Sequence, residues 1–312
     1  MQLSLIDSCL VKISKGNDFL ETIEKEVGFG KIRRELDKMY SSTMGRPSHP
    51  PMVMFRMMLL QFFYNLSDPQ IEEQVNDRLS FRKFAGLGLE DKVPDETSMV
   101  RFRQRLLEHG LEKKLLEIVN GQLASKGLLL KKATIVDASL IQAATKNPSS
   151  GSEDEPQDKD ADYTSRKGKA FYGYKAHVSS DADNGFVRKA GLTSASVHDS
   201  QMFEHVLPSE QDYVFADKAY ASEEREQNLA LSNIASGIAY KGYRNRPLSE
   251  QKKHANRCFA SIRCRIEKIF GHWKRNVGYR RVRYIGLLKN ELELQFRCIA
   301  YNLRRMHTLL TA

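Results

Sequence analysis

Apolar residues recur at helical spacing through about the first 127 residues of the chain. Two stretches in this region carry helix-start signals. In LSDPQIEEQV, Asp68 precedes a proline, which predicts an N-cap at Asp68 and a proline at the first helical position. In VPDETSMVRFRQRLLEHG, Asp95 is the predicted N-cap and Gly110 the predicted stop. The pattern therefore predicts a bundle of short helices joined by tight turns.

From about residue 128 the pattern changes to short runs of β-branched and aromatic residues, separated by Gly, Asn, Ser and Asp. Helical stretches are predicted after Ser200 and Ser222, and longer helices at about 249–276 and 287–309. This order of elements predicts an α/β sheet with helices packed on it. The predicted strands lie in the segments KATIVDASL, AFYGYKAHVSS, FVRKAGLTSAS, DYVFADKAY and IASGIAY.

The segment at 147–169 has no apolar periodicity, which predicts a mobile loop. Its six acids, from Glu153 to Asp162, are interpreted as solvated charge rather than as ligands. A chain of 312 residues is long enough for about two domains. We expect a helical domain at 1–127 and a strand-rich domain at 128–312.

The chain is basic, because its 49 Lys and Arg residues exceed its 39 Asp and Glu residues and give a formal net charge of +10. This excess favours a polyanionic partner, with nucleic acid as the first candidate and an acidic membrane surface as the alternative. The longest apolar run, at 52–66, contains Arg56 and is too short to span a bilayer. The start of the chain lacks a signal-peptide pattern, and the four cysteines lack a CxxC pair or zinc spacing. A reducing cytosol is therefore the expected location.

One basic segment contains a single acid. Residues 257–283 hold nine Lys or Arg residues and only Glu267. Since Glu267 is four residues after Arg263, the two can form a helix ion pair worth a few tenths of a kcal/mol. Lys274 lies two helical turns beyond Glu267, so the three residues are predicted to share one face. A carboxylate beside a basic strip also suits a metal-dependent enzyme that acts on phosphates, and this segment alone leaves both interpretations open.

Two other acids follow apolar runs of predicted strands. Asp137 follows ATIV, and Asp217 follows YVFA. An aspartate at the end of a strand is often a turn or cap residue. Strand ends are also where α/β proteins assemble sites from residues that are distant in sequence. Together with Glu267, these residues form a set of three carboxylates that can converge.

With these residues in place, the sequence resembles the DDE transposases of bacterial insertion sequences, particularly the IS-five group. The resemblance extends from about Pro51 to Arg305. The segment RCRIEKIFGHWKR carries the family's R-x3-E-x6-K signature at Arg263, Glu267 and Lys274. Related groups have a tyrosine three residues before the arginine, where this chain has Ala260. The other matching motifs are LLQFFYNLSDPQIEEQ, FRKFAGL, PDETSMVRFRQRL, TIVDASLI, YGYKAHV, SVHDSQ and FADKAY.

The resemblance implies a helical N-terminal DNA-binding domain and a ribonuclease-H-like catalytic domain, with Asp137 on the first strand, Asp217 on the fourth and Glu267 on a following helix. The three carboxylates would hold two Mg2+ ions, for which Mn2+ can substitute. The implied function is a transposase that binds the terminal inverted repeats of its element, cleaves double-stranded DNA there and joins the ends to target DNA. It would act as a homodimer or larger assembly at the nucleoid of a bacterial cytoplasm, away from membranes.

Two other functions remain open at this stage: a domesticated DNA-binding protein without catalysis, and a stand-alone metal-dependent nuclease. Trp273, His177 and His198 are interpreted as structural residues rather than as site residues. Arg263 and Lys274 are expected to contact DNA phosphates near the cleaved bond. Further candidates for DNA contacts are Arg265, Lys268 and Arg275, and in the helical domain Arg101 and Arg103.

Overall fold

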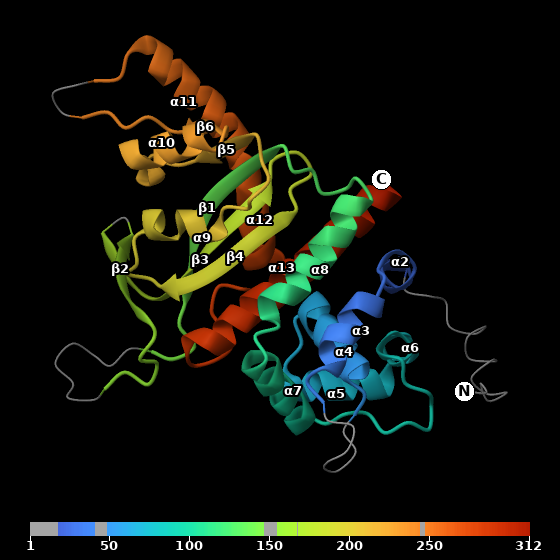
Figure 1. The fold of residues 1–312 in the computed structure, drawn as a ribbon. Coiled ribbons are helices and arrows are strands. Elements are labelled where there is room, and N and C mark those ends of the chain that lie inside the picture. Colours follow the sequence, from blue (N-terminus) through green and yellow to red (C-terminus); the bar gives the residue numbers. More distant parts are fainter. Residues whose placement is uncertain (1–17, 41–48, 147–154, 167, 244–246) are drawn as a thin grey trace. The chain divides into compact units, whose positions relative to one another are not determined.

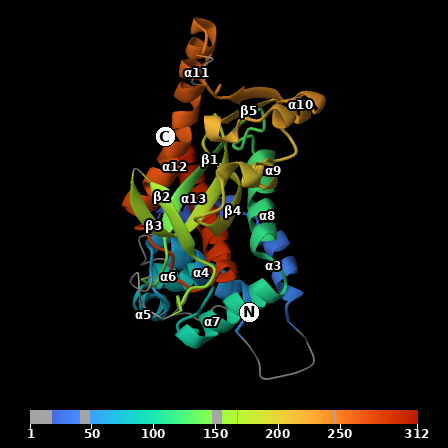
Figure 2. The ribbon, with the colours of Figure 1, turned by 90° about the vertical axis from the view of Figure 1, so that its left-hand side faces the viewer.

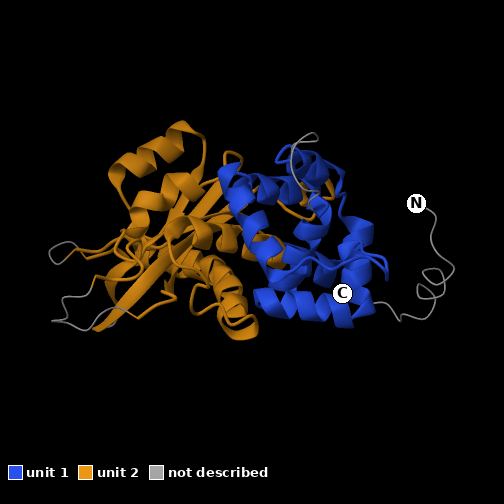
Figure 3. Cartoon of the chain, turned by 90° about the horizontal axis from the view of Figure 1, so that it is seen from below, with its two compact units in different colours: residues 1–122, 302–312 blue, residues 123–301 orange. Residues whose placement is uncertain are grey.

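The chain divides into two compact units, Met1–Gln122 with Asn302–Ala312 and Leu123–Tyr301 (Figure 3). The expected domain boundary after residue 127 lies a little beyond the end of the first segment. The last residues of the chain, expected in the second domain, belong to the helical unit. The computed structural model describes residues 18–40, 49–146, 155–166, 168–243 and 247–312.

The first unit is helical, as predicted, and is built around the apolar helix α4, whose residues are mostly buried. The charge that interrupts this apolar run, Arg56, pairs with Glu24 at 2.7 Å and donates a hydrogen bond to the carbonyl of Phe84 at 2.9 Å. These partners explain how a cation is accommodated in an otherwise apolar helix. The helices are α2 (Asp18–Glu26), α3 (Gly30–Asp37), α4 (Pro51–Tyr64), α5 (Asp68–Asp77), α6 (Leu79–Ala85), α7 (Glu96–Glu108) and α8 (Glu112–Ser125) (Figure 1).

The predicted start of α7 is confirmed, since the side chain of Asp95 accepts a hydrogen bond from the backbone N–H of Ser98 at 2.7 Å. The predicted cap of α5 is wrong by one residue. Ser67 is the N-cap, in a capping box with Gln70, and Asp68 is the first residue of the helix. A reciprocal pair of hydrogen bonds satisfies two backbone donors, which favours Ser67 over a single cap from Asp68.

The carboxylate of Asp68 instead binds Arg103 of α7. The side chain of Arg103 is only 10% exposed, and its guanidinium forms a two-pronged ion pair with this carboxylate. Arg101, two residues earlier, is exposed. A buried, paired arginine stabilises the packing of its own unit. This position does not suit the predicted DNA contact of Arg103, whereas Arg101 stays available for one.

The second unit contains a six-stranded mixed sheet in the order β2-β3-β1-β5-β6, with β4 also paired to β3. Strands β1, β3 and β4 are antiparallel neighbours, whereas β1, β5 and β6 run parallel. The predicted α/β architecture, with a helical N-terminal region and a ribonuclease-H-like mixed sheet, is therefore confirmed. The strands are β1 (Ala133–Gln142), β2 (Asp162–Arg166), β3 (Lys169–Asp181), β4 (Val187–Ser194), β5 (Tyr213–Ala216) and β6 (Ala235–Ile238).

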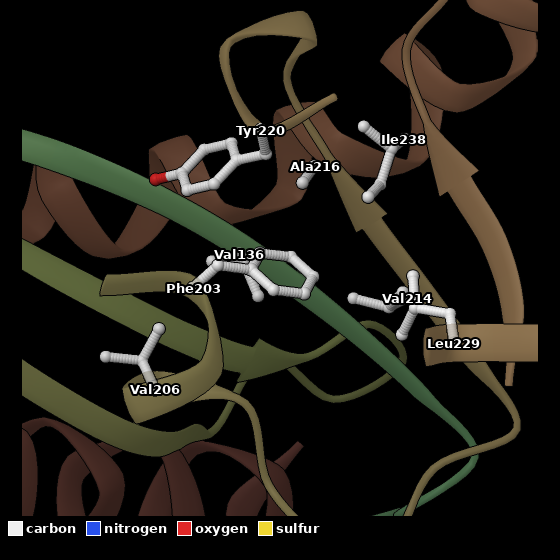
Figure 4. Packing of buried hydrophobic residues seen from close by; sticks show 8 residues of the cluster. All are labelled: Val136, Phe203, Val206, Val214, Ala216, Tyr220, Leu229 and Ile238. Atoms are coloured by element: carbon white, nitrogen blue, oxygen red, sulfur yellow. The ribbon is translucent and has the colours of Figure 1, made fainter. Parts of the chain in front are cut away.

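Helical segments cover both faces of the parallel part of the sheet. On one face lie η1 (Asp199–Met202), α9 (Phe203–Val206), η2 (Lys218–Tyr220) and α10 (Glu223–Leu231). On the other face lies α11 (Glu250–Arg263), whose Phe259 ring contacts Phe215 at 6.0 Å between centroids. The cluster that buries the first face comprises Val136, Phe203, Val206, Val214, Ala216, Tyr220, Leu229 and Ile238 (Figure 4).

The helix predicted at about 249–276 is a composite of four segments. Helix α11 continues into α12 (Glu267–Gly271) (Figure 2). The 3-10 turn η3 (Cys264–Ile266) joins the two, and a π-helical segment, η4 (His272–Asn276), follows α12. The changes of helix type alter the angular spacing of side chains, so the predicted single face of a uniform α-helix does not apply. Trp273 is buried against Phe270 and Tyr279, as the core interpretation predicted.

The final helix, α13 (Leu287–Thr311), starts in the second unit and ends in residues of the first. Within the described parts of the chain, no helix is long and apolar enough to cross a membrane.

The segment predicted as a mobile loop contains ordered structure. Its residues 162–166 form β2, which pairs with β3, while 147–154 and 167 lie outside the described residues. Asp158 is fully buried, and its Oδ1 accepts hydrogen bonds from the Tyr174 hydroxyl at 2.6 Å and from the backbone N–H of Gly286 at 3.3 Å. The prediction of solvated charge is therefore wrong for Asp158, which ties this segment to the start of α13.

Gly173 is a position where the sheet tolerates no side chain. It lies where β3 exchanges β2 for β1 as a partner, and a Cβ there would lie 2.3 Å from the carbonyl oxygen of Ile141. Because backbone cannot move aside cheaply, we expect Gly173→Ala to lower the free energy of unfolding by about 2 kcal/mol or more. The matched control is Gly121→Ala at an exposed position of helix α8, where nothing lies within 4 Å of the added Cβ and a stabilising change of about 0.5–1 kcal/mol is expected. Urea denaturation of both variants measures this; equal stabilities would contradict it.

Candidate active site

The register of the sheet brings Asp137 and Asp217 together. Strands β1 and β5 run parallel with Val136 paired to Ala216, and paired strands lie about 4.8 Å apart, so the two aspartates that follow are neighbours in space. Val136 faces the buried cluster, and side chains alternate along β1, so Asp137 lies on the face covered by α11. Asp217, just beyond the end of β5, reaches Arg263 of the same helix. The prediction that Asp137 ends its strand is wrong, because β1 continues to Gln142.

The two aspartates differ in environment. Burial, and to a smaller extent the negative charges of Asp217 and Asp199, raise the pKa of Asp137 to about 6. A backbone hydrogen bond from Ala138 and the positive charge of Arg263 act in the opposite direction. Asp217 is more open, with 43% of its side chain exposed, and caps η2 through a hydrogen bond from the N–H of Lys218. Negative charge is thus concentrated at one edge of the sheet.

Two cations of the predicted signature reach this edge. Nη1 of Arg263 lies 2.8 Å from Oδ1 of Asp217. Nζ of Lys274 donates a hydrogen bond of 2.6 Å to the hydroxyl of Ser139, which lies two residues beyond Asp137 on the same face of β1. The composite helix therefore directs Arg263 to Asp217 and Lys274 to the strand that carries Asp137.

Glu267 does not join the aspartates in the structure. It is exposed at the start of α12, and its carboxylate forms no ion pair or hydrogen bond with another described residue. The alternative helix ion pair with Arg263 does not form either, because Arg263 binds Asp217. In the ranges that the structure describes, no group of three His, Cys, Asp or Glu side chains is arranged to hold a metal ion. The structure assembles two of the three predicted acids and leaves the third at the surface.

Family models match most of the sequence. A model described as a transposase domain (DUF772) matches residues 8–105, and one described as a transposase DDE domain matches residues 129–303, more than half of the chain. The chain belongs to the DDE transposase family. The matched DDE segment contains both aspartates, Glu267 and the two cations of the signature.

Solved transposase structures share a limited similarity with this transposase. The piggyBac transposase in a synaptic complex with hairpin DNA gives a TM-score of 0.46 at 10% identity, over 97% of this chain and 74% of that chain. The Mos1 strand transfer complex gives a TM-score of 0.22 at 12% identity, over 85% of this chain and 96% of that chain. Because both scores are below 0.5, family membership rests on the sequence models and the fold on the sheet itself.

The donor atoms of this transposase fit a hard divalent cation in part. Asp137 and Asp217 offer adjacent carboxylate oxygens, the ligand type that Mg2+ prefers. Each aspartate is oriented by one backbone hydrogen bond, at 2.8 Å from Ala138 and 2.7 Å from Lys218. Burial, with a smaller contribution from neighbouring negative charge, raises the pKa of Asp137, and a bound cation would favour its charged form. The two aspartates therefore suit metal binding, and a third ligand is needed to complete a site.

Asp199 is a residue near this site that sequence reasoning missed, because its place at the start of a short helix resembled a cap. Nζ of Lys175 lies 2.7 Å from its Oδ1 and also donates to the carbonyl of Val197 at 2.7 Å. The charge of Asp199 raises the pKa of Asp137 and, after burial itself, that of Tyr220. Asp137 and Asp217 also raise the pKa of Tyr220, so Asp199 shares one electrostatic environment with the two aspartates. The sequence signal was the motif SVHDSQ, in which Asp199 lies three residues after the predicted strand segment FVRKAGLTSAS.

The two histidines have structural positions. His198 is itself the N-cap of η1, with Nδ1 at 2.7 Å from the hydroxyl of Ser200. His177 is fully buried, with Nε2 at 2.9 Å from the hydroxyl of Thr193 and no partner for Nδ1 among the described residues. Burial lowers the pKa of His177 to about 4, so the ring is neutral near pH 7. His177 is therefore a buried, neutral histidine with one ring nitrogen that has no partner among the described residues.

The remaining basic candidates lie on the surface of this transposase. Arg265 is exposed and donates a hydrogen bond to the carbonyl of Ala182 at 2.7 Å. Lys268 and Arg275 are also exposed. These positions leave their charges accessible to an anionic partner.

Proposed function

We propose that this transposase binds the terminal inverted repeats of its own insertion sequence, cleaves the DNA there and joins the ends to target DNA, as a member of the IS-five group of bacterial elements. The observation that carries the proposal is the pair of Asp137 and Asp217, with Arg263 bound to Asp217 and Lys274 bound to Ser139 on the strand of Asp137. A polyanionic substrate and two adjacent carboxylates repel each other unless cations lie between them. Carboxylates next to positively charged side chains therefore support metal-dependent phosphoryl transfer.

Asp137, Asp217 and Glu267 would hold two Mg2+ ions, with Mn2+ as a substitute. When bound, such ions activate an attacking water or DNA 3′-hydroxyl and stabilise the leaving oxygen. The sheet positions the two aspartates. Glu267 is the proposed third ligand because it lies on the composite helix between Arg263 and Lys274, whose side chains both reach the aspartate edge.

The cations of the composite helix would bind the DNA backbone. Arg263 and Lys274 would contact phosphates near the cleaved bond, and the exposed Arg265, Lys268 and Arg275 would extend this contact and make it dependent on salt. The helical unit, including exposed Arg101, would recognise the element ends. The proposed partners are double-stranded DNA and further copies of the chain, in a homodimer or larger assembly at the bacterial nucleoid in the cytoplasm.

The two alternatives differ in their requirement for the acids. A binding protein without catalysis has no use for a carboxylate such as Asp137, whose burial disfavours its charge. A stand-alone nuclease would use the same residues as the transposase. Joined products are therefore the observation that separates these two enzymes.

Metal removal gives the direct test. Purified protein is incubated with labelled duplexes from the DNA that flanks the coding sequence, together with a target plasmid and Mg2+ or Mn2+. We expect nicked and joined products, and chelation by EDTA should lower their formation by about a hundredfold or more, equivalent to a loss of several kcal/mol of barrier stabilisation. Nicks without joining would support the nuclease, and binding without either product would support the non-catalytic protein.

A further inference from the structure

Asp217 is already engaged by a cation of the protein. Its Oδ1 accepts a hydrogen bond from the N–H of Lys218 at 2.7 Å and lies 2.8 Å from Nη1 of Arg263. Arg263 is the last residue of α11, and its side chain is 27% exposed. The guanidinium therefore occupies the aspartate that is the most accessible of the acid pair.

This arrangement conflicts with simultaneous binding of a divalent cation and of Arg263 to one carboxylate. Two cations on the same oxygen repel each other strongly at such short distance. A DNA phosphate is a good alternative partner for Arg263, because a guanidinium binds phosphate with two parallel hydrogen bonds. Because Arg263 is partly exposed at the end of α11, its side chain can exchange partners without repacking the core.

We propose that Arg263 is an internal counter-ion that holds Asp217 in the DNA-free protein and transfers to a DNA phosphate on binding, so that DNA and divalent cations bind cooperatively. The inference rests on the proposed role of Asp217 as a metal ligand, but not on strand transfer. By linkage, DNA then raises the affinity for the cation by the same factor by which the cation raises the affinity for DNA. The free protein is thereby kept from loading the ions before the substrate is present.

Manganese titration followed by electron paramagnetic resonance tests, without any catalysis, whether Arg263 opposes cation binding at Asp217 in the DNA-free protein. Arg263→Gln frees Asp217, and we expect Mn2+ to bind about fivefold more tightly than to the wild type, the range of a partly exposed ion pair. The matched control is Lys268→Gln, which removes one exposed positive charge five residues along the same helix and should change the affinity by less than about twofold. Equal affinities of the two variants would overturn the proposal.

The transfer of Arg263 to a DNA phosphate is tested by repeating the titrations with a mixed-sequence duplex that carries 3′-deoxy ends and cannot be joined. The duplex should raise the Mn2+ affinity of the wild type at least about threefold more than that of Arg263→Gln, in which no counter-ion remains to be displaced. The same enhancement in both proteins would overturn the transfer of Arg263 to DNA.

Thermal unfolding verifies that each variant is folded. Arg263→Lys keeps the positive charge but cannot form two parallel hydrogen bonds with the carboxylate, so its Mn2+ affinity should lie between those of the wild type and Arg263→Gln. If Arg263→Gln does not fold, Arg263→Lys takes its place in the titrations. An affinity of Arg263→Lys above that of Arg263→Gln would overturn the proposal.

Nicking and joining are scored separately from the titrations. Absent joining with intact coupling between Mn2+ and DNA refutes the transposase proposal alone, whereas joining without this coupling refutes the counter-ion proposal alone.

Discussion

Asp137→Asn and Asp217→Asn are each expected to lower metal-dependent DNA cleavage by about a hundredfold or more, because each removes a charged oxygen ligand while retaining the shape of the side chain. DNA affinity should stay near that of the wild type, since the basic residues remain. It should rise slightly for Asp217→Asn, which releases Arg263 from its ion pair. Cleavage on labelled duplexes and equilibrium binding in EDTA measure the two quantities. Cleavage within about tenfold of the wild type, or about 1.4 kcal/mol of barrier, would remove that aspartate from the active site.

The pH dependence of stability identifies Asp137 independently of cleavage. Burial raises its pKa from 3.8 to about 6 in the folded protein. An acid with a raised folded-state pKa holds its proton more tightly in the folded than in the unfolded chain, so its contribution to stability falls as the pH rises through that interval. Asp137→Asn lacks this titration. In EDTA, its melting temperature relative to the wild type should therefore rise across the interval and level off above it, and a difference independent of pH would contradict the buried carboxylate.

The acid pair could be predicted in part from the sequence. Asp137 and Asp217 stand out because each follows an apolar run that reads as a buried strand. Their adjacency could not be derived from local pattern, because it depends on β1 and β5 pairing in parallel with Val136 opposite Ala216. The register depends on pairing between strands that are distant in sequence. The hydrophobic pattern of one segment does not show which strand it pairs with or which residues lie opposite each other.

Side-chain partners were the least predictable feature. The sequence places Arg101 and Arg103 on one predicted helix, but only the tertiary ion pair with Asp68 buries Arg103. Spacing alone likewise favours an ion pair of Arg263 with Glu267, four residues away. In the structure Arg263 pairs with Asp217 instead. An exposed ion pair within a helix is worth only a few tenths of a kcal/mol, and the two neighbouring carboxylates of Asp137 and Asp217 attract a cation more strongly.

Asp199 shows the same limit from another direction. An acid at the first position of a short helix is interpreted as a cap by any local rule. Its proximity to Asp137 follows from the ion pair with Lys175, which fixes the start of η1 against β3. Such a position is recognised only when both strands and both short helices are placed.

Glu267→Gln is expected to abolish cleavage while leaving stability unchanged. The carboxylate makes no ion pair with Arg263 or with another described residue, so the free energy of unfolding should change by less than about 0.5 kcal/mol. If Glu267 completes the metal site when DNA and cations are bound, loss of its charge should lower Mg2+- or Mn2+-dependent cleavage by about a hundredfold or more. DNA affinity should stay level or rise, because an anion near the phosphates is removed.

The matched control for this variant is Glu250→Gln, an exposed glutamate at the start of α11 that pairs with Lys253 at 2.8 Å. The change of charge is the same and lies on the same composite helix, but far from the aspartate edge, since α11 rises by about 1.5 Å per residue. Cleavage, DNA affinity and melting temperature are measured on both variants. Glu250→Gln should resemble the wild type in all three. If Glu267→Gln also cleaves like the wild type, Glu267 is a surface charge and the third ligand must come from another acid, for which Asp199 is the candidate because its charge raises the pKa of Asp137.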